Sequence, residues 1–152
     1  MIALALILSY VESLLPVFVA VPGVKMGLPN IVIMFALYSL GVKDAAIISL
    51  IRVVLAGALF GSVFSMLYSA AGAVLSLAVM AVLLKTKRFS PVGVSVAGGV
   101  AHNAGQIIVA ILVTETAQLI YYLPVLCISG IAAGILIGVV SGIIINRLQK
   151  QI

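Results

Sequence analysis

A cluster of hydrogen-bonding side chains interrupts the apolar stretch VSVAGGVAHNAGQIIV, residues 94–109: His102, Asn103 and Gln106. His102 and Gln106 are four residues apart and would share one face of a helix, with Asn103 about 100° further round. Imidazole and amide groups donate and accept hydrogen bonds without needing a metal ion. The cluster therefore predicts either recognition of a polar solute or hydrogen bonding between helices, and both interpretations stay open.

Other polar residues in apolar stretches extend this set. Glu12 and Arg52 are ionisable, and Asn30 follows Pro29 at the start of an apolar segment. Ionisable groups at membrane depth are costly and usually face a bundle interior or a cavity. We expect Asn30 and Arg52 to line a solute cavity with the cluster. A structural ion pair between Glu12 and Arg52 is the alternative that stays open.

Composition indicates that these residues lie in a membrane. The chain has 152 residues, of which 65% are hydrophobic and 7% are charged, whereas about a quarter of the residues in soluble domains are charged. A soluble domain of this length exposes too much of its surface to hide so much apolar material. We predict an all-α, polytopic membrane protein.

Hydrophilic and Gly/Pro-containing breaks divide the chain into six apolar segments. A helix needs roughly 20 residues to cross a bilayer, fewer when it packs inside a bundle. We predict a six-helix transmembrane bundle in a single integral membrane domain, residues 1–152. The predicted spans are 1–20, 28–41, 44–60, 63–84, 92–114 and 123–146, of which the second and third are short.

The basic residues predict the orientation. Lys and Arg near span ends favour the cytoplasmic side. Six spans with a cytoplasmic N-terminus leave Lys25 as the basic residue of the outer segments and place six basic residues inside: Lys43, Lys85, Lys87, Arg88, Arg147 and Lys150. We therefore predict a multi-pass protein of a bacterial cell membrane with both termini in the cytoplasm.

The last apolar segment has a stripe of glycines at intervals of four: Gly130, Gly134, Gly138 and Gly142. Such a stripe lets a second helix backbone approach closely. Helix packing within the chain is the favoured interpretation, and a surface for a partner protein is the alternative.

Several functions are excluded by what the sequence lacks. It has no GxxxxGK[ST] phosphate loop and no HExxH zinc motif. Three acidic residues cannot build the paired aspartate-rich motifs that hold magnesium and a diphosphate. The basic residues are scattered, which disfavours nucleic-acid binding. We predict a protein that is not an enzyme, with no cofactor, no metal site and no nucleic-acid partner.

Three motifs carry a resemblance to a known family: PGVKMGLPNI (22–31), LIRVVLAGALFGS (50–62) and GVAHNAGQ (99–106). They resemble the Gx transporter family, also catalogued as heptaprenyl diphosphate synthase component I, and the similarity covers nearly the whole chain. The resemblance implies a fold similar to the substrate-binding S-components of energy-coupling-factor (ECF) transporters. S-components bind a vitamin or similar small molecule and deliver it with a coupling protein and two ATPases.

Together these observations predict a substrate-binding membrane protein for the uptake of a small organic solute, vitamin-like or isoprenoid-related, energised by separate partner subunits. The residues expected to bind the solute are His102, Asn103, Gln106, Asn30 and Arg52. The alternative is a non-catalytic, membrane-bound component I, the accessory subunit of a heptaprenyl diphosphate synthase whose catalytic subunit would be the partner.

Overall fold

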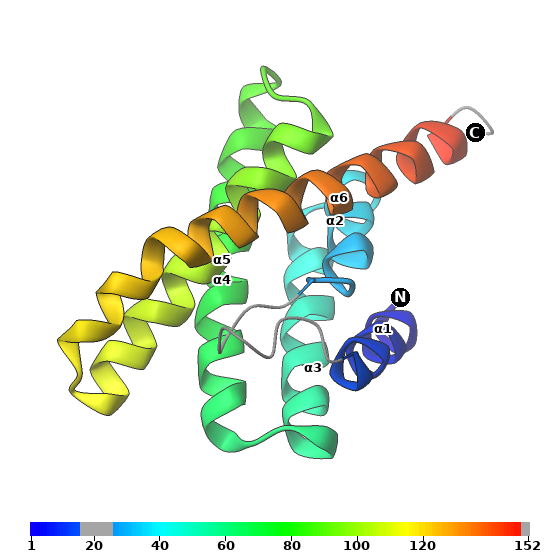
Figure 1. The fold of residues 1–152 in the computed structure, drawn as a ribbon. Helices are drawn as coiled ribbons and strands as arrows, with labels where there is room; N and C mark the ends of the chain where they lie inside the picture. Colours follow the sequence, from blue (N-terminus) through cyan, green and yellow to red (C-terminus); the bar gives the residue numbers. More distant parts are fainter. Residues whose placement is uncertain (16–25, 150–152) are drawn as a thin grey trace.

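Six α-helices and one short 3-10 helix make up the described part of the chain, residues 1–15 and 26–149 of a computed structural model (Figure 1). The all-helical architecture confirms the predicted fold class, and each predicted apolar segment contains one helix. Lys25 and residues 16–20 of the predicted first span lie outside the described residues. The elements are α1 (Ile2–Leu14), α2 (Asn30–Ser39), α3 (Val42–Phe60), α4 (Val63–Thr86), α5 (Pro91–Thr114), η1 (Ala117–Tyr122) and α6 (Leu123–Gln149).

Turn and capping residues separate the helices where the sequence is interrupted. Gly41 joins α2 to α3 with a φ of 101°, a conformation that glycine adopts without steric cost. Ser62 and Ser90 each accept a hydrogen bond from the backbone N–H three residues further on, at 3.1 and 3.2 Å, and so cap α4 and α5. Pro91 follows in the first turn of α5, where its missing N–H breaks no helical hydrogen bond.

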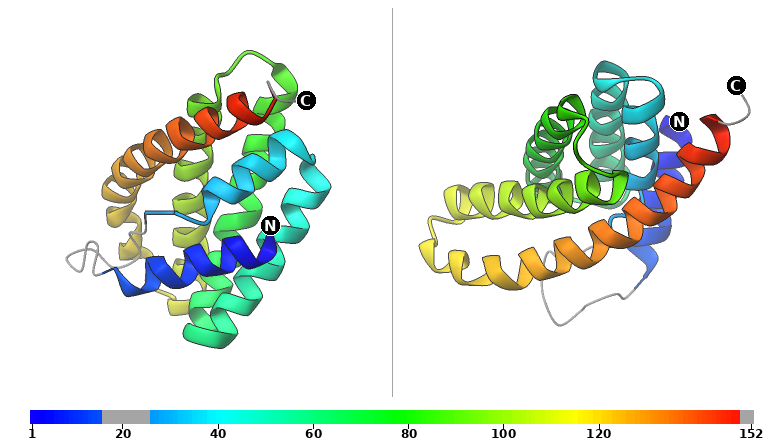
Figure 2. Two further views of the ribbon diagram at one scale, coloured as in Figure 1. Left: turned by 90° about the vertical axis from the view of Figure 1, so that its right-hand side faces the viewer. Right: turned by 90° about the horizontal axis from the view of Figure 1, so that it is seen from above.

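Helix α5 lies at the centre of the packing and contacts α4 on one side and α6 on the other (Figure 1). Helix α3 runs beside α4, and α1 packs against α3 (Figures 1 and 2). Helix α2 contacts both α3 and α6. The helices therefore surround a common interior to which α1 to α6 all contribute side chains.

Helices α1 and α2 are shorter than the spans predicted for them. Helix α2 has 10 residues, which extend about 15 Å, roughly half of the hydrocarbon core of a bilayer. Five of its side chains are buried, so it fills the interior between its neighbours instead of facing lipid. Helix α1 has 13 residues and ends at Leu14, shortly before Pro16 in the sequence. Within the described residues, the two helices are thus shorter than the predicted segments 1–20 and 28–41.

Three helical stretches of the described chain are long and apolar enough to cross a membrane: Val63–Thr86, Pro91–Thr114 and Ala117–Leu148. Large apolar side chains point outward from them, among them Leu112 and Ile128, which are 71% and 69% exposed. Such a surface suits lipid better than water. The six crossings and the cytoplasmic termini stay predictions.

The glycine stripe of α6 faces the backbone of α5. A Cβ atom at Gly134 would lie 2.6 Å from the Cα of Val96, and one at Gly138 would lie 2.6 Å from the Cα of Val92. At Gly130 it would lie 2.9 Å from the carbonyl oxygen of Gly99. Gly142 has room, because the nearest atom to such a Cβ is 3.8 Å away. Three of the four glycines thus allow α5 and α6 to approach closely.

The substitution Gly134→Ala should force α5 and α6 apart, because the new methyl group would meet backbone that cannot rotate away. We expect a loss of about 1–3 kcal/mol in the free energy of unfolding. Thermal unfolding in detergent, followed by circular dichroism, measures it. Gly142→Ala is the matched control and should unfold like the wild type; equal melting of the two variants would contradict this account of the helix contact.

Candidate functional site

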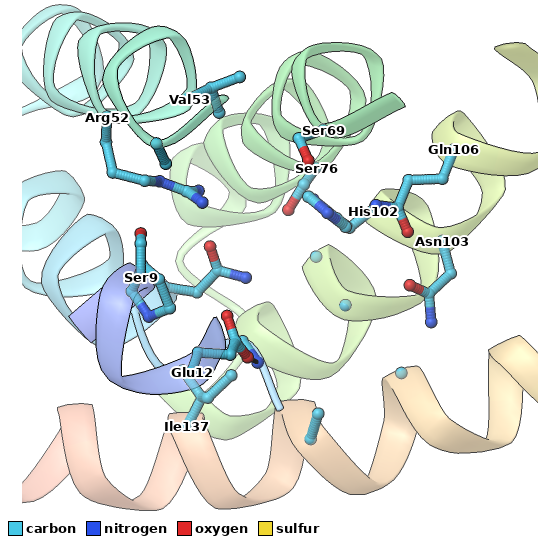
Figure 3. A pocket seen from close by; sticks show the side chains of 18 of the residues that line it. Ser9, Glu12, Arg52, Val53, Ser69, Ser76, His102, Asn103, Gln106 and Ile137 are labelled. Atoms are coloured by element: carbon cyan, nitrogen blue, oxygen red, sulfur yellow. Dashed lines mark hydrogen bonds between the residues drawn. The ribbon is translucent and has the colours of Figure 1, made fainter. Parts of the chain in front are cut away.

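A cavity of about 180 Å³ lies among the helices and is lined from all six of them. The five residues predicted to bind a solute all line it: Asn30 from α2, Arg52 from α3, and His102, Asn103 and Gln106 from α5. Glu12 lines it from α1 (Figure 3). Residues that are far apart in the sequence are therefore brought to one space.

Glu12 fixes the start of α2. One of its carboxylate oxygens, Oε1, accepts hydrogen bonds from the backbone N–H groups of Gly27 and, at 3.4 Å, Leu28. These groups precede α2, at the end of the helix where unpaired N–H groups and the helix dipole favour negative charge. Glu12 thus joins α1 to α2.

Arg52 extends from α3 toward the cavity (Figure 3). Its Nε is buried and has no hydrogen-bond partner among the described residues. The guanidinium interacts electrostatically with Glu12. Within the described part of the chain, however, the hydrogen bonds of Glu12 go to backbone N–H groups and not to Arg52. The two residues are therefore electrostatic neighbours, but they do not form the direct ion pair that was the alternative interpretation of the sequence.

His102 extends from α5 toward α4, where Ser69 and Ser76 lie (Figure 3). A Cβ atom at Gly72 would lie 2.9 Å from the Nε2 of His102, so the imidazole fits against α4 only because position 72 has no side chain. Gln106, one turn further along α5, points in the direction of His102 (Figure 3).

Asn103 differs from its two neighbours in the cluster. Its side chain points toward α6 and is 9% exposed (Figure 3). Its Nδ2 donates hydrogen bonds to the carbonyl oxygen of Leu126 and, at 3.4 Å, to the Oγ of Ser129. The structural interpretation of the cluster thus applies to Asn103, whereas His102 and Gln106 are turned toward the interior.

Serines form a part of the lining that the sequence analysis did not single out. Ser65, Ser69 and Ser76 line the cavity from α4, and Ser9 and Ser95 line it from α1 and α5. The three serines of α4 are separated by four and seven residues, so they share one face of the helix. The spacing of these serines in an otherwise apolar helix is the sequence pattern from which this part of the lining could have been predicted.

The site offers hydrogen-bond donors and acceptors, one guanidinium and one carboxylate already bonded to backbone. The described residues contain no group of three or more His, Cys, Asp or Glu side chains placed to hold a metal ion. Sulfur and hydrocarbon groups complete the lining, from Met34, Met66, Met80 and Ile137. The arrangement is suited to binding a small molecule that has a polar and an apolar part.

The family model for heptaprenyl diphosphate synthase component I matches residues 1–144. The chain therefore belongs to the heptaprenyl diphosphate synthase component I family. Neither a curated protein nor a solved structure gives a significant match.

The variant Glu12→Ala leaves the N–H groups of Gly27 and Leu28 without their acceptor. It should lower the free energy of unfolding by about 1–3 kcal/mol, because two partly buried donors are left unpaired. Glu12→Gln keeps a side-chain oxygen that can accept and should lose less. Thermal unfolding of both variants in the same detergent decides, and equal losses would show that Glu12 does not act through these hydrogen bonds.

Proposed function

We propose that this member of the component I family is a non-catalytic membrane protein that binds a small organic solute in its cavity for uptake, energised by separate partner subunits. One observation carries the proposal: polar side chains of α2, α3 and α5, namely Asn30, Arg52, His102 and Gln106, converge on a single cavity.

Structural hydrogen bonding alone accounts for only part of this arrangement. One polar side chain that has its hydrogen-bond partners is enough to join two helices, as Asn103 joins α5 to α6. Arg52 differs, because its buried Nε has no hydrogen-bond partner among the described residues. A charged side chain is costly at membrane depth, and no hydrogen bond of Arg52 joins it to another helix among the described residues. This observation supports a role of Arg52 in contacting a solute.

The size of the cavity supports a small solute, or the polar end of a larger one. Its volume of about 180 Å³ exceeds that of an engineered cavity of roughly 150 Å³ that binds benzene. It is smaller than the roughly 300–1,000 Å³ of pockets that hold drug-sized ligands. A vitamin-like fragment or the head of an isoprenoid-related molecule fits this range.

The energy for uptake would come from separate subunits, because the sequence has no phosphate loop for binding ATP. The resemblance to ECF S-components supports a coupling protein and two ATPases as those partners. Ion coupling within this chain is disfavoured, because the sequence has three acidic residues and few of them lie in apolar stretches.

A second function is favoured by the family description itself. Under that description the chain would be a non-catalytic accessory subunit of a heptaprenyl diphosphate synthase, with a catalytic prenyl diphosphate synthase subunit as its partner. Three acidic residues are too few for the carboxylate clusters that bind magnesium and a diphosphate, so the condensation chemistry would belong to that partner.

The substitutions His102→Ala and Gln106→Ala should reduce the amount of small molecule that co-purifies with the protein, by about tenfold each if one hydrogen bond is lost from the bound state. Native mass spectrometry of the purified protein measures retention. Asn103→Ala is the matched control from the same cluster: it should lower thermal stability through the α5–α6 contact with a smaller effect on retention. Unchanged retention in His102→Ala and Gln106→Ala would contradict the proposal.

Affinity purification from detergent-solubilised membranes separates the two functions. Recovery of a coupling protein with two ATPases is the expected result for uptake. Recovery of a prenyl diphosphate synthase subunit instead would favour the accessory role and overturn the transport proposal.

A further inference from the structure

The two opposite charges that line the cavity differ in their hydrogen bonding. The carboxylate of Glu12 is stabilised by two backbone N–H groups and by the amino end of α2. Arg52 has no comparable acceptor among the described residues, and its buried Nε is unbonded. The other acidic residues, Asp44 and Glu115, are exposed and do not line the cavity. The guanidinium of Arg52 thus has Glu12 as an electrostatic neighbour but no hydrogen-bonded anionic partner among the described residues.

We infer that the solute carries one anionic group, a carboxylate or a phosphate, and that Arg52 binds it. This inference rests on the proposed function, because it names the chemistry of the solute in the same cavity. A guanidinium presents a planar fork of donors that matches the oxygens of either anion, and bonds of this kind are among the strong ones. The anionic group would accept hydrogen bonds from the end of the guanidinium that extends toward the cavity (Figure 3).

A cationic or neutral solute fits these residues less well. A cation would have to bind beside a guanidinium while the carboxylate of Glu12 is held by the N–H groups of Gly27 and Leu28. A neutral solute would leave the guanidinium of Arg52 without a hydrogen-bonded anion, because the hydrogen bonds of its electrostatic neighbour Glu12 go to backbone N–H groups. An anionic solute supplies that partner.

The remaining lining describes the rest of the solute. His102 and Gln106 offer hydrogen-bonding groups on α5, whereas Arg52 enters from α3 (Figure 3). Met34, Met66 and Met80 supply adaptable apolar surface. A compact organic acid or phosphate ester of about the size of a substituted benzene has these properties.

Four small aromatic probes test the charge of the solute: benzoate, phenyl phosphate, benzamide and benzamidinium. Equilibrium dialysis with the full chain in lipid nanodiscs gives a dissociation constant for each. We expect at least one of the two anions to bind about tenfold or more tightly than benzamide and benzamidinium. The stronger of the two anions identifies the group as a carboxylate or a phosphate.

Variants of Arg52 tie the selectivity to this residue. Arg52→Gln should weaken binding of the preferred anion by about 10- to 100-fold, the effect of losing a charged hydrogen bond. Arg52→Lys keeps the positive charge but loses the planar fork of donors, so its affinity for the anion should lie between those of the wild type and Arg52→Gln. This second variant keeps the test valid if Arg52→Gln fails to fold. Arg147→Gln removes an exposed guanidinium from the last turn of α6 and should bind like the wild type.

Three results would overturn the inference: binding of benzamide or benzamidinium as tight as that of the better anion, unchanged anion binding in folded Arg52→Gln, or no binding of any probe. The proposed function fails separately. If the molecule that co-purifies is neutral or cationic and its retention still needs His102, the cavity is a solute site and only the anionic assignment is wrong.

Discussion

The structure depends on one constraint: polar groups inside an apolar helix bundle must find their partners within the protein. Each unpaired polar group that is cut off from water costs the folded protein several kcal/mol of stability, on the order of the stabilisation from many apolar contacts. The chain meets the constraint by joining helices at their polar residues. Glu12 joins α1 to the start of α2, and Asn103 joins α5 to α6. Small residues make the joints possible, as Gly72 does for the imidazole of His102.

Arg52 does not fully meet the constraint, and neither do the buried hydroxyl groups of Tyr38 and Ser141, which do not line the cavity. The charge of Arg52 has Glu12 as an electrostatic neighbour, yet its Nε has no hydrogen-bond partner in the described part of the chain. The same helix contacts that satisfy Glu12 and Asn103 leave a polar space among the six helices, which is the cavity. Packing and the candidate site are therefore two results of one requirement.

The sequence predicts the helices and the inward direction of the rare polar residues, because both follow from chemistry that each segment carries alone. Ser62, Ser90 and Pro91 begin helices by local hydrogen bonds and ring geometry, and polar residues in apolar helices turn away from lipid. Tertiary contacts decide the rest. The short α2 is stable because its neighbours bury it, and Asn103 turns to α6 because Leu126 presents a carbonyl oxygen there. No periodicity in the sequence contains that information.

The most direct test of the central claim compares the surroundings of two positions after Cys127 is replaced by serine. Spin labels at Ser76→Cys, on the cavity lining, and at Leu112→Cys, on the outer surface, are exposed to oxygen, which concentrates in lipid, and to a water-soluble nickel chelate. The account predicts frequent oxygen collisions at position 112 and far fewer at position 76. Equal oxygen accessibility at the two positions would show that the polar face of α4 points toward lipid and encloses no site.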